Sequence, residues 1–139
     1  MQKYRCVAQQ DGWGCGVACV ASLLGVSYDS ARAVLVGIKG KDIDSRPCGL
    51  SLRSLAKAVP GHRVIYAKAK EVSRWPVGSV VFLSEVSGRY AGSGHYLLKT
   101  PDGWMDPLFN GDEESPEAGF RARLPRGTSV QAALVPDSV

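Results

Sequence analysis

Three apolar runs rich in helix-favouring residues lie in the first part of the chain, separated by residues that begin or end helices. The first run, CGVACVASLL at 15–24, is rich in Ala and Leu, has no breaker after its second residue, and is followed by Gly25 as a C-cap. Ser27 and Ser51 stand in the N-cap positions of the other two runs. The pattern predicts an N-terminal helical lobe over about residues 1–60, with helices over 15–24, 28–36 and 52–59.

The pattern changes at His62, where short β-prone runs alternate with turn signals such as Pro-Val-Gly, Ser-Gly-Arg and Pro-Asp-Gly. Residues 107–119 are polar, rich in Pro and Gly and without periodicity, so we expect a loop there. Helices followed by strands are typical of an α+β domain. We therefore expect a C-terminal antiparallel β-sheet lobe over about residues 61–139, with strands over 63–69, 79–85, 95–100 and 131–135.

Length and composition indicate one ordinary globular domain, since the chain has 139 residues, of which 45% are hydrophobic and 22% charged. The net charge is +4 and the pI is near 9.0, but Lys and Arg are scattered without a run or an RNA-binding aromatic motif. We therefore expect no nucleic-acid partner. The N-terminus lacks the apolar core of a signal peptide, and no stretch reaches the length of a bilayer span. We expect a cytoplasmic protein without a membrane segment.

Four cysteines, Cys6, Cys15, Cys19 and Cys48, allow two disulfides or a zinc site in principle. However, the chain has no Cys-x-x-Cys pair, and its two histidines lie far apart in the sequence. In a reducing cytosol we expect free thiols, most of them buried as small apolar residues. No metal ion or organic cofactor is therefore expected.

Cys15 is the main candidate for chemistry, because it lies at the start of the first predicted helix. A helix N-terminus presents unpaired N–H groups and the positive end of the macrodipole, and both stabilise a thiolate. Gly14 and Gly16 on either side allow a substrate backbone to approach the sulfur. Trp13 is placed either to line the substrate groove or to pack under the loop. The alternative for Cys15 is a buried structural cysteine.

Three further residues extend this candidate into a catalytic constellation. Gln9 precedes Cys15 by six positions, His95 heads the apolar run HYLLKT, and an acid followed by proline stands at Asp106. A cysteine at a helix start, a histidine on a strand of a separate lobe, and an acid that orients the histidine are the arrangement of papain-like catalysis.

The turn between the predicted histidine strand and the acid has two geometries. If residues 101–102 form a two-residue loop, Asp106 falls opposite Leu97. Asp106 then lies on the same face as His95 and diagonal to it, within side-chain reach. If Gly103 instead makes a bulge, the register shifts by one residue and Asp106 faces away. The spacing permits the pair, and both geometries remain open.

The segment QQDGWGCGVACVASLLG at 9–25 resembles the active-site segment of the bacterial peptidases that remove double-glycine leaders from bacteriocins. The residues that match the family pattern are Gln9, Asp11, Cys15, Gly16, Ala18 and Cys19. Gly14 stands where the family has an aspartate. Further along, GLSLRSLAKA at 49–58 resembles the family's Gly-x-Ser segment and following helix, and GHYLLKTPDGWMDP at 94–107 resembles its Gly-His-Phe strand and Asp-Pro ending.

This resemblance implies a papain-like cysteine peptidase that needs no cofactor and acts on a peptide or protein substrate, with cleavage after small residues such as Gly-Gly. The implied site residues are Cys15 as nucleophile, His95 as general base, Asp106 as its orienting partner and Gln9 as the oxyanion-hole side chain. Two alternatives use the same fold, namely a catalytically idle peptide-binding module and an acyltransferase with the same triad.

For three other residues we expect no catalytic role. His62 lies outside every motif and is expected at the surface or in a turn. Cys19, one helical turn after Cys15, is expected in the core. Asp11 is expected either to cap the nucleophile helix or to contact substrate.

Overall fold

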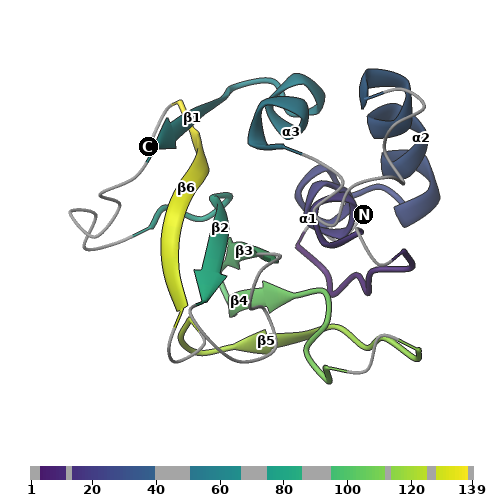
Figure 1. Cartoon of the computed structure of the whole chain (residues 1–139), viewed down its shortest axis with the longest axis vertical. Coiled ribbons are helices and arrows are strands. Elements are labelled where there is room, and N and C mark those ends of the chain that lie inside the picture. Colours follow the sequence, from purple (N-terminus) through teal and green to yellow (C-terminus); the bar gives the residue numbers. More distant parts are fainter. Residues whose placement is uncertain are drawn as a thin grey trace.

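The computed structural model of the chain describes residues 4–11, 14–39, 51–66, 75–85, 95–111, 114–124 and 128–137. Within these ranges the helices are α1 (Cys15–Leu24), α2 (Tyr28–Lys39) and α3 (Leu52–Ala58). The strands are β1 (His62–Tyr66), β2 (Val80–Glu85), β3 (His95–Thr100), β4 (Gly103–Asp106), β5 (Gly119–Arg121) and β6 (Thr128–Pro136). The described helices precede the strands of one antiparallel sheet, so the predicted α+β class is confirmed (Figure 1).

Local hydrogen bonds explain where the helices begin and end. The Ser30 N–H donates to Ser27 Oγ at 3.0 Å, and the Ser54 N–H donates to Ser51 Oγ at 3.2 Å. Both predicted N-caps are therefore confirmed. Gly25 ends α1 at φ 72°, a left-handed conformation that favours glycine. α2 continues three residues beyond its predicted end.

The sheet has the strand order β1-β6-β2-β3-β4-β5, and the long strand β6 lies between β1 and β2 (Figure 1). The predicted strands correspond to β1, β2, β3 and β6, of which β6 is longer than predicted. The part of the predicted strand 63–69 that follows Tyr66 lies outside the described residues. The short edge strand β5 was not predicted, because it starts at Gly119, where the sequence indicates the end of a loop.

Helix α1 is buried along nearly its whole length and packs against one face of the sheet (Figure 1). Val17 and Val20 of α1 belong to one apolar cluster with Val80, Leu98 and Leu134 of the sheet. The buried residues of a second cluster are Val81, Leu83, Leu97, Trp104, Ala133 and Val135. Full burial of one such aliphatic side chain stabilises the fold by about 1.5–3 kcal/mol. The first cluster therefore fixes α1 relative to β3.

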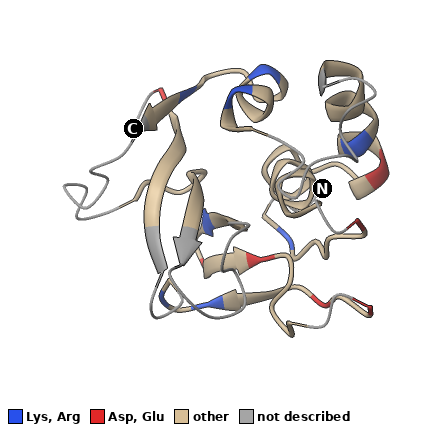
Figure 2. Cartoon of the chain, in the orientation of Figure 1, with Lys and Arg blue, Asp and Glu red and all other residues tan. Residues whose placement is uncertain are grey.

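In the described part of the chain, no single helix is both long enough and apolar enough to cross a membrane. α1 and α2 taken together have the length and composition of a membrane span, but the chain bends by 116° at the break between them. Lys and Arg are scattered over helices, strands and connecting segments of the described chain (Figure 2).

The hairpin of β3 and β4 decides the position of the candidate acid. Thr100 pairs with Gly103, which leaves residues 101–102 as the loop. The Thr100 hydroxyl donates to the Gly103 carbonyl at 2.8 Å and closes this loop. Of the two geometries, the two-residue loop is therefore the correct one, and Asp106 lies on the same face as His95.

Gly103 is required where it stands, and we predict that Gly103→Ala destabilises the protein. Its φ is +118°, and an added Cβ would lie 2.5 Å from the Arg121 carbonyl oxygen of β5. A backbone clash of this kind costs about 1–3 kcal/mol or more in the free energy of unfolding. Gly37→Ala is the matched control, since a Cβ there meets nothing within 4 Å inside α2, and it should stabilise the protein by about 0.5–1 kcal/mol. Urea unfolding followed by circular dichroism measures both, and a neutral Gly103→Ala would contradict the described approach of β4 and β5.

Candidate active site

Cys15 is the first residue of α1, as predicted. Gly14 is the N-cap, and no side chain among the described residues caps this helix. The Gly14 carbonyl accepts the Ala18 N–H at 3.0 Å, so helical bonding begins at this turn. The positive end of the helix dipole therefore lies at Cys15, which keeps 8% of its surface exposed.

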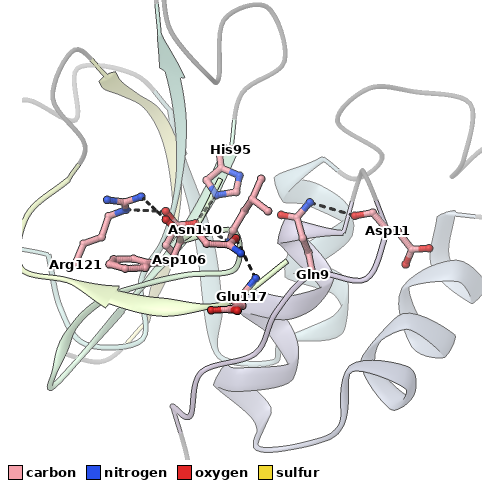
Figure 3. Close-up of polar contacts among 9 residues, drawn as sticks. Gln9, Asp11, His95, Asp106, Asn110, Glu117 and Arg121 are labelled. Atoms are coloured by element: carbon pink, nitrogen blue, oxygen red, sulfur yellow. Dashed lines mark hydrogen bonds and ion pairs between the residues drawn. The ribbon is translucent and has the colours of Figure 1, made fainter. Parts of the chain in front are cut away.

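His95 is the first residue of β3 and is 4% exposed. Its Nε2 lies 2.7 Å from Oδ1 of Asp106 (Figure 3). The Cys15 side chain hydrogen-bonds to the same imidazole. Because Nε2 faces the carboxylate, Nδ1 is the ring nitrogen that remains for the thiol. The structure thus brings the predicted Cys15, His95 and Asp106 together in one chain of contacts.

The protonation of His95 follows from two opposing effects. Burial lowers the pKa of His95, because an imidazolium loses its hydration. The hydrogen bonds to Asp106 and to Cys15, together with the negative charges of these groups, outweigh burial and raise the pKa of His95 to about 9. The ring, which lies between the Asp106 carboxylate and the Cys15 sulfur, is therefore protonated at neutral pH.

Asp106 has no exposed surface, and several donors compensate its buried charge. Oδ1 accepts the Leu108 N–H at 2.9 Å in addition to the His95 ring, and Oδ2 accepts Nε of Arg121 at 2.7 Å (Figure 3). Burial raises the pKa of Asp106, but His95, then Arg121 and the Leu108 N–H lower it to about 2. The acid is therefore ionised throughout the physiological range.

Sequence reasoning missed Arg121. A buried aspartate with a single histidine partner keeps oxygen lone pairs that need further donors. This requirement is the signal that could have predicted a second partner for Asp106. It does not say which of the basic residues Arg121, Arg123 and Arg126 reaches the acid, because the short strand β5 that positions Arg121 has no clear pattern.

Gln9 is 4% exposed and is tied to the segment that follows Asp106. Its backbone N–H donates to the Pro107 carbonyl at 3.2 Å. Its side-chain Nε2 donates to the Asp11 carbonyl at 3.2 Å (Figure 3), and among the described residues its Oε1 has no hydrogen-bond partner. An amide nitrogen carries two N–H donors, so the Gln9 side chain keeps donor capacity after this bond.

Asp11 does not cap α1, and its expected contact with substrate stays a prediction. Its Oδ2 accepts the Tyr28 hydroxyl at 2.7 Å and Nε of Arg32 at 3.0 Å. Burial and then the bond to Asp11 raise the pKa of Tyr28, which keeps this phenol a neutral donor. The expectation that Asp11 caps α1 is wrong, because its side chain faces α2 instead. Its carbonyl accepts both Gln9 Nε2 and the Gly14 N–H, so Asp11 holds the turn before Cys15 against α2.

The structure gives the two glycines beside Cys15 a packing role. A Cβ on Gly14 would overlap the Tyr28 hydroxyl, and a Cβ on Gly16 would lie 3.2 Å from the Tyr96 ring and 3.3 Å from Leu55. Both glycines therefore allow close approach of protein groups, and their contact with a substrate backbone stays a prediction. Trp13 lies outside the described residues.

Cys6, Cys19 and His62 are not part of this chain of contacts. Cys19 is fully buried, as expected, and burial, followed by the charges of Cys15 and Asp106, raises the pKa of its thiol well above the usual value. Cys6 is a free, exposed thiol, which is consistent with the expectation that most, but not all, of the cysteines are buried, and Cys48 lies outside the described residues. His62 is the half-buried first residue of β1 and not a turn residue as expected, and it bonds through Nε2 to the Gly78 carbonyl at 3.2 Å.

No group of three or more His, Cys, Asp or Glu side chains among the described residues could hold a metal ion. The sequence matches no model of a known protein family and no curated protein. A function for this chain accordingly rests on the chemistry of the site.

Proposed function

We propose that this chain is a cysteine peptidase with a papain-like two-lobe arrangement, in which Cys15 attacks a peptide carbonyl and His95 transfers the proton. The observation that carries the proposal is the position of one imidazole. His95 contacts Asp106 through Nε2 at 2.7 Å and contacts the Cys15 side chain at the start of α1. A histidine placed between an acid and a nucleophile is the functional unit of acyl transfer.

The first step uses the positive charge of the His95 ring. With the pKa of His95 raised to about 9, the ring holds a proton at neutral pH, and this imidazolium stabilises negative charge on the Cys15 sulfur as it attacks. The thiolate attacks the carbonyl carbon, and the carbonyl electron pair moves to the oxygen. The N–H groups of the first turn of α1 and the remaining amide donor of Gln9 are the groups that stabilise this oxyanion.

The second half of the reaction returns the proton. His95 gives its proton to the leaving amine as the tetrahedral intermediate breaks down to a thioester on Cys15. The neutral ring, still oriented by Asp106, then accepts a proton from water, which attacks the thioester and releases the acid product. No step requires a group beyond these side chains and water.

The substrate we propose is a peptide with small residues beside the scissile bond, such as Gly-Gly. Cys15, His95 and Gln9 are between 4% and 8% exposed, and this limited access favours small residues beside the scissile bond. The resemblance of residues 9–25 to the double-glycine leader peptidases supports the same choice.

The thiol of Cys15 should be the most reactive one in the chain. At pH 6, where an ordinary thiol is almost fully protonated, we expect iodoacetamide to alkylate Cys15 about tenfold or more faster than Cys6, Cys19 or Cys48. His95→Ala should abolish this advantage, because the imidazolium that stabilises the thiolate is lost. His62→Ala is the matched control and should leave it unchanged.

Peptide mass spectrometry locates the alkylated sulfur in that experiment. Cleavage of a fluorogenic peptide that ends in Gly-Gly-aminomethylcoumarin is measured in parallel, and Cys15→Ala and His95→Ala should both lose it. Equal labelling of all four thiols, or loss of labelling in His62→Ala instead of His95→Ala, would refute the assignment.

Gln9→Ala should lower turnover by about a hundredfold or more with little change in the Michaelis constant, because an oxyanion donor acts mainly when the carbonyl oxygen becomes charged. Gln10→Ala is the control, since Gln10 is exposed, and it should stay within about threefold of the parent. Thermal unfolding checks that both variants fold. If the two substitutions have equal effects on turnover, the oxyanion is not stabilised by Gln9.

A further inference from the structure

The carboxylate of Asp106 is held from two sides. Oδ1 lies against His95 and the Leu108 N–H, whereas Oδ2 accepts Nε of Arg121 at 2.7 Å. Asp106 has no exposed surface, and the Arg121 side chain is 23% exposed. A charge-assisted bond in a buried setting is short and directional, so it defines the orientation of the carboxylate as well as its charge.

The Arg121 side chain is itself held in place by Phe109. Its guanidinium carbon lies 4.8 Å from the centre of the Phe109 ring, and Nη2 donates to the Phe109 carbonyl at 3.4 Å. Phe109 in turn packs on Gly119 of β5, where an added Cβ would lie 2.7 Å from the ring. The arginine therefore approaches Asp106 from a built position rather than as a mobile surface side chain.

We propose that Arg121 is a positioning residue of the catalytic site, which holds Asp106 ionised and correctly turned while His95 gains and loses its proton. The inference rests on the proposed function. In that reaction His95 becomes neutral when it protonates the leaving amine, and Asp106 then loses its positive partner. A guanidinium keeps its charge through this step, so Arg121 continues to compensate the buried carboxylate and Oδ1 remains on the His95 ring.

The charged and titratable groups around Asp106 come from three elements. They are His95 on β3, Arg121 on β5 and the Cys19 thiol on α1, and His95 in turn interacts with the Cys15 side chain on α1. Removal of Arg121 takes away a positive charge, and this raises the pKa of Asp106. An Asp106 that gains a proton in mild acid no longer stabilises the imidazolium of His95, so the reactivity that this imidazolium confers on Cys15 falls at a higher pH than in the parent.

The experiment measures the rate of Cys15 alkylation by iodoacetamide from pH 4 to pH 9 and needs no substrate. Arg121→Met removes the charge and the planar fork, Arg121→Lys keeps a charge without the fork, and Arg123→Met is the control at a neighbouring exposed arginine. We expect the acid limb of the Arg121→Met profile to move up by about one pH unit, which lowers the rate on that limb about tenfold. Arg121→Lys should fall between the two, and Arg123→Met should match the parent. With the Gly-Gly peptide, Arg121→Met should lower kcat and leave KM nearly unchanged.

Each outcome decides the question. A folded Arg121→Met variant with the parent's pH profile overturns the positioning role and leaves the Cys15–His95 site intact. If Arg121→Met does not fold, Arg121→Lys decides, and a Lys variant with the parent's profile overturns the proposal. A parent protein whose Cys15 behaves as an ordinary thiol refutes the proposed function itself, before any Arg121 variant is compared.

Discussion

The charge of a fully buried carboxylate is the constraint on which the site depends. Asp106 is stable as an anion in the interior only because donors surround it, and each donor comes from a different part of the sheet. His95 begins β3, Leu108 follows the end of β4, and Arg121 ends β5. The need to compensate one charge thus links the hairpin, the loop after it and the edge strand, and it leaves the His95 ring in one orientation.

The packing of α1 on the sheet supplies the second half of the arrangement. Gly16 lets α1 approach Tyr96, the neighbour of His95 on β3, so the start of the helix reaches the start of the strand. Asp11 holds the preceding turn against α2 and accepts the Gln9 amide. Cysteine, imidazole and amide are therefore positioned by apolar packing, by the buried Asp106 network and by the partly exposed Asp11 network.

Elements with local signals could be predicted from the sequence, whereas contacts between distant segments could not. The serine caps and Gly25 are local features, and they located the helices. The Pro-Asp-Gly turn located the hairpin but left two registers open, and only the pairing of β3 with β4 decides between them. Strand β5 is only three residues long and owes its position to pairing with β4, so no periodicity marks it. The partner of Asp11 on α2 and the partner of Asp106 on β5 were missed for the same reason, because both depend on how separate elements pack.

The most direct test of the account is an NMR titration of the His95 ring. The chain has two histidines, so His62 provides a reference resonance in the same spectra. The account predicts that His95 remains protonated at neutral pH and loses its proton near pH 9, in line with the raised pKa, and that Cys15→Ala lowers this midpoint because the thiolate is removed. A His95 ring that is already neutral at pH 7, or a midpoint that does not respond to Cys15→Ala, would contradict the ion pair from which the proposed chemistry begins.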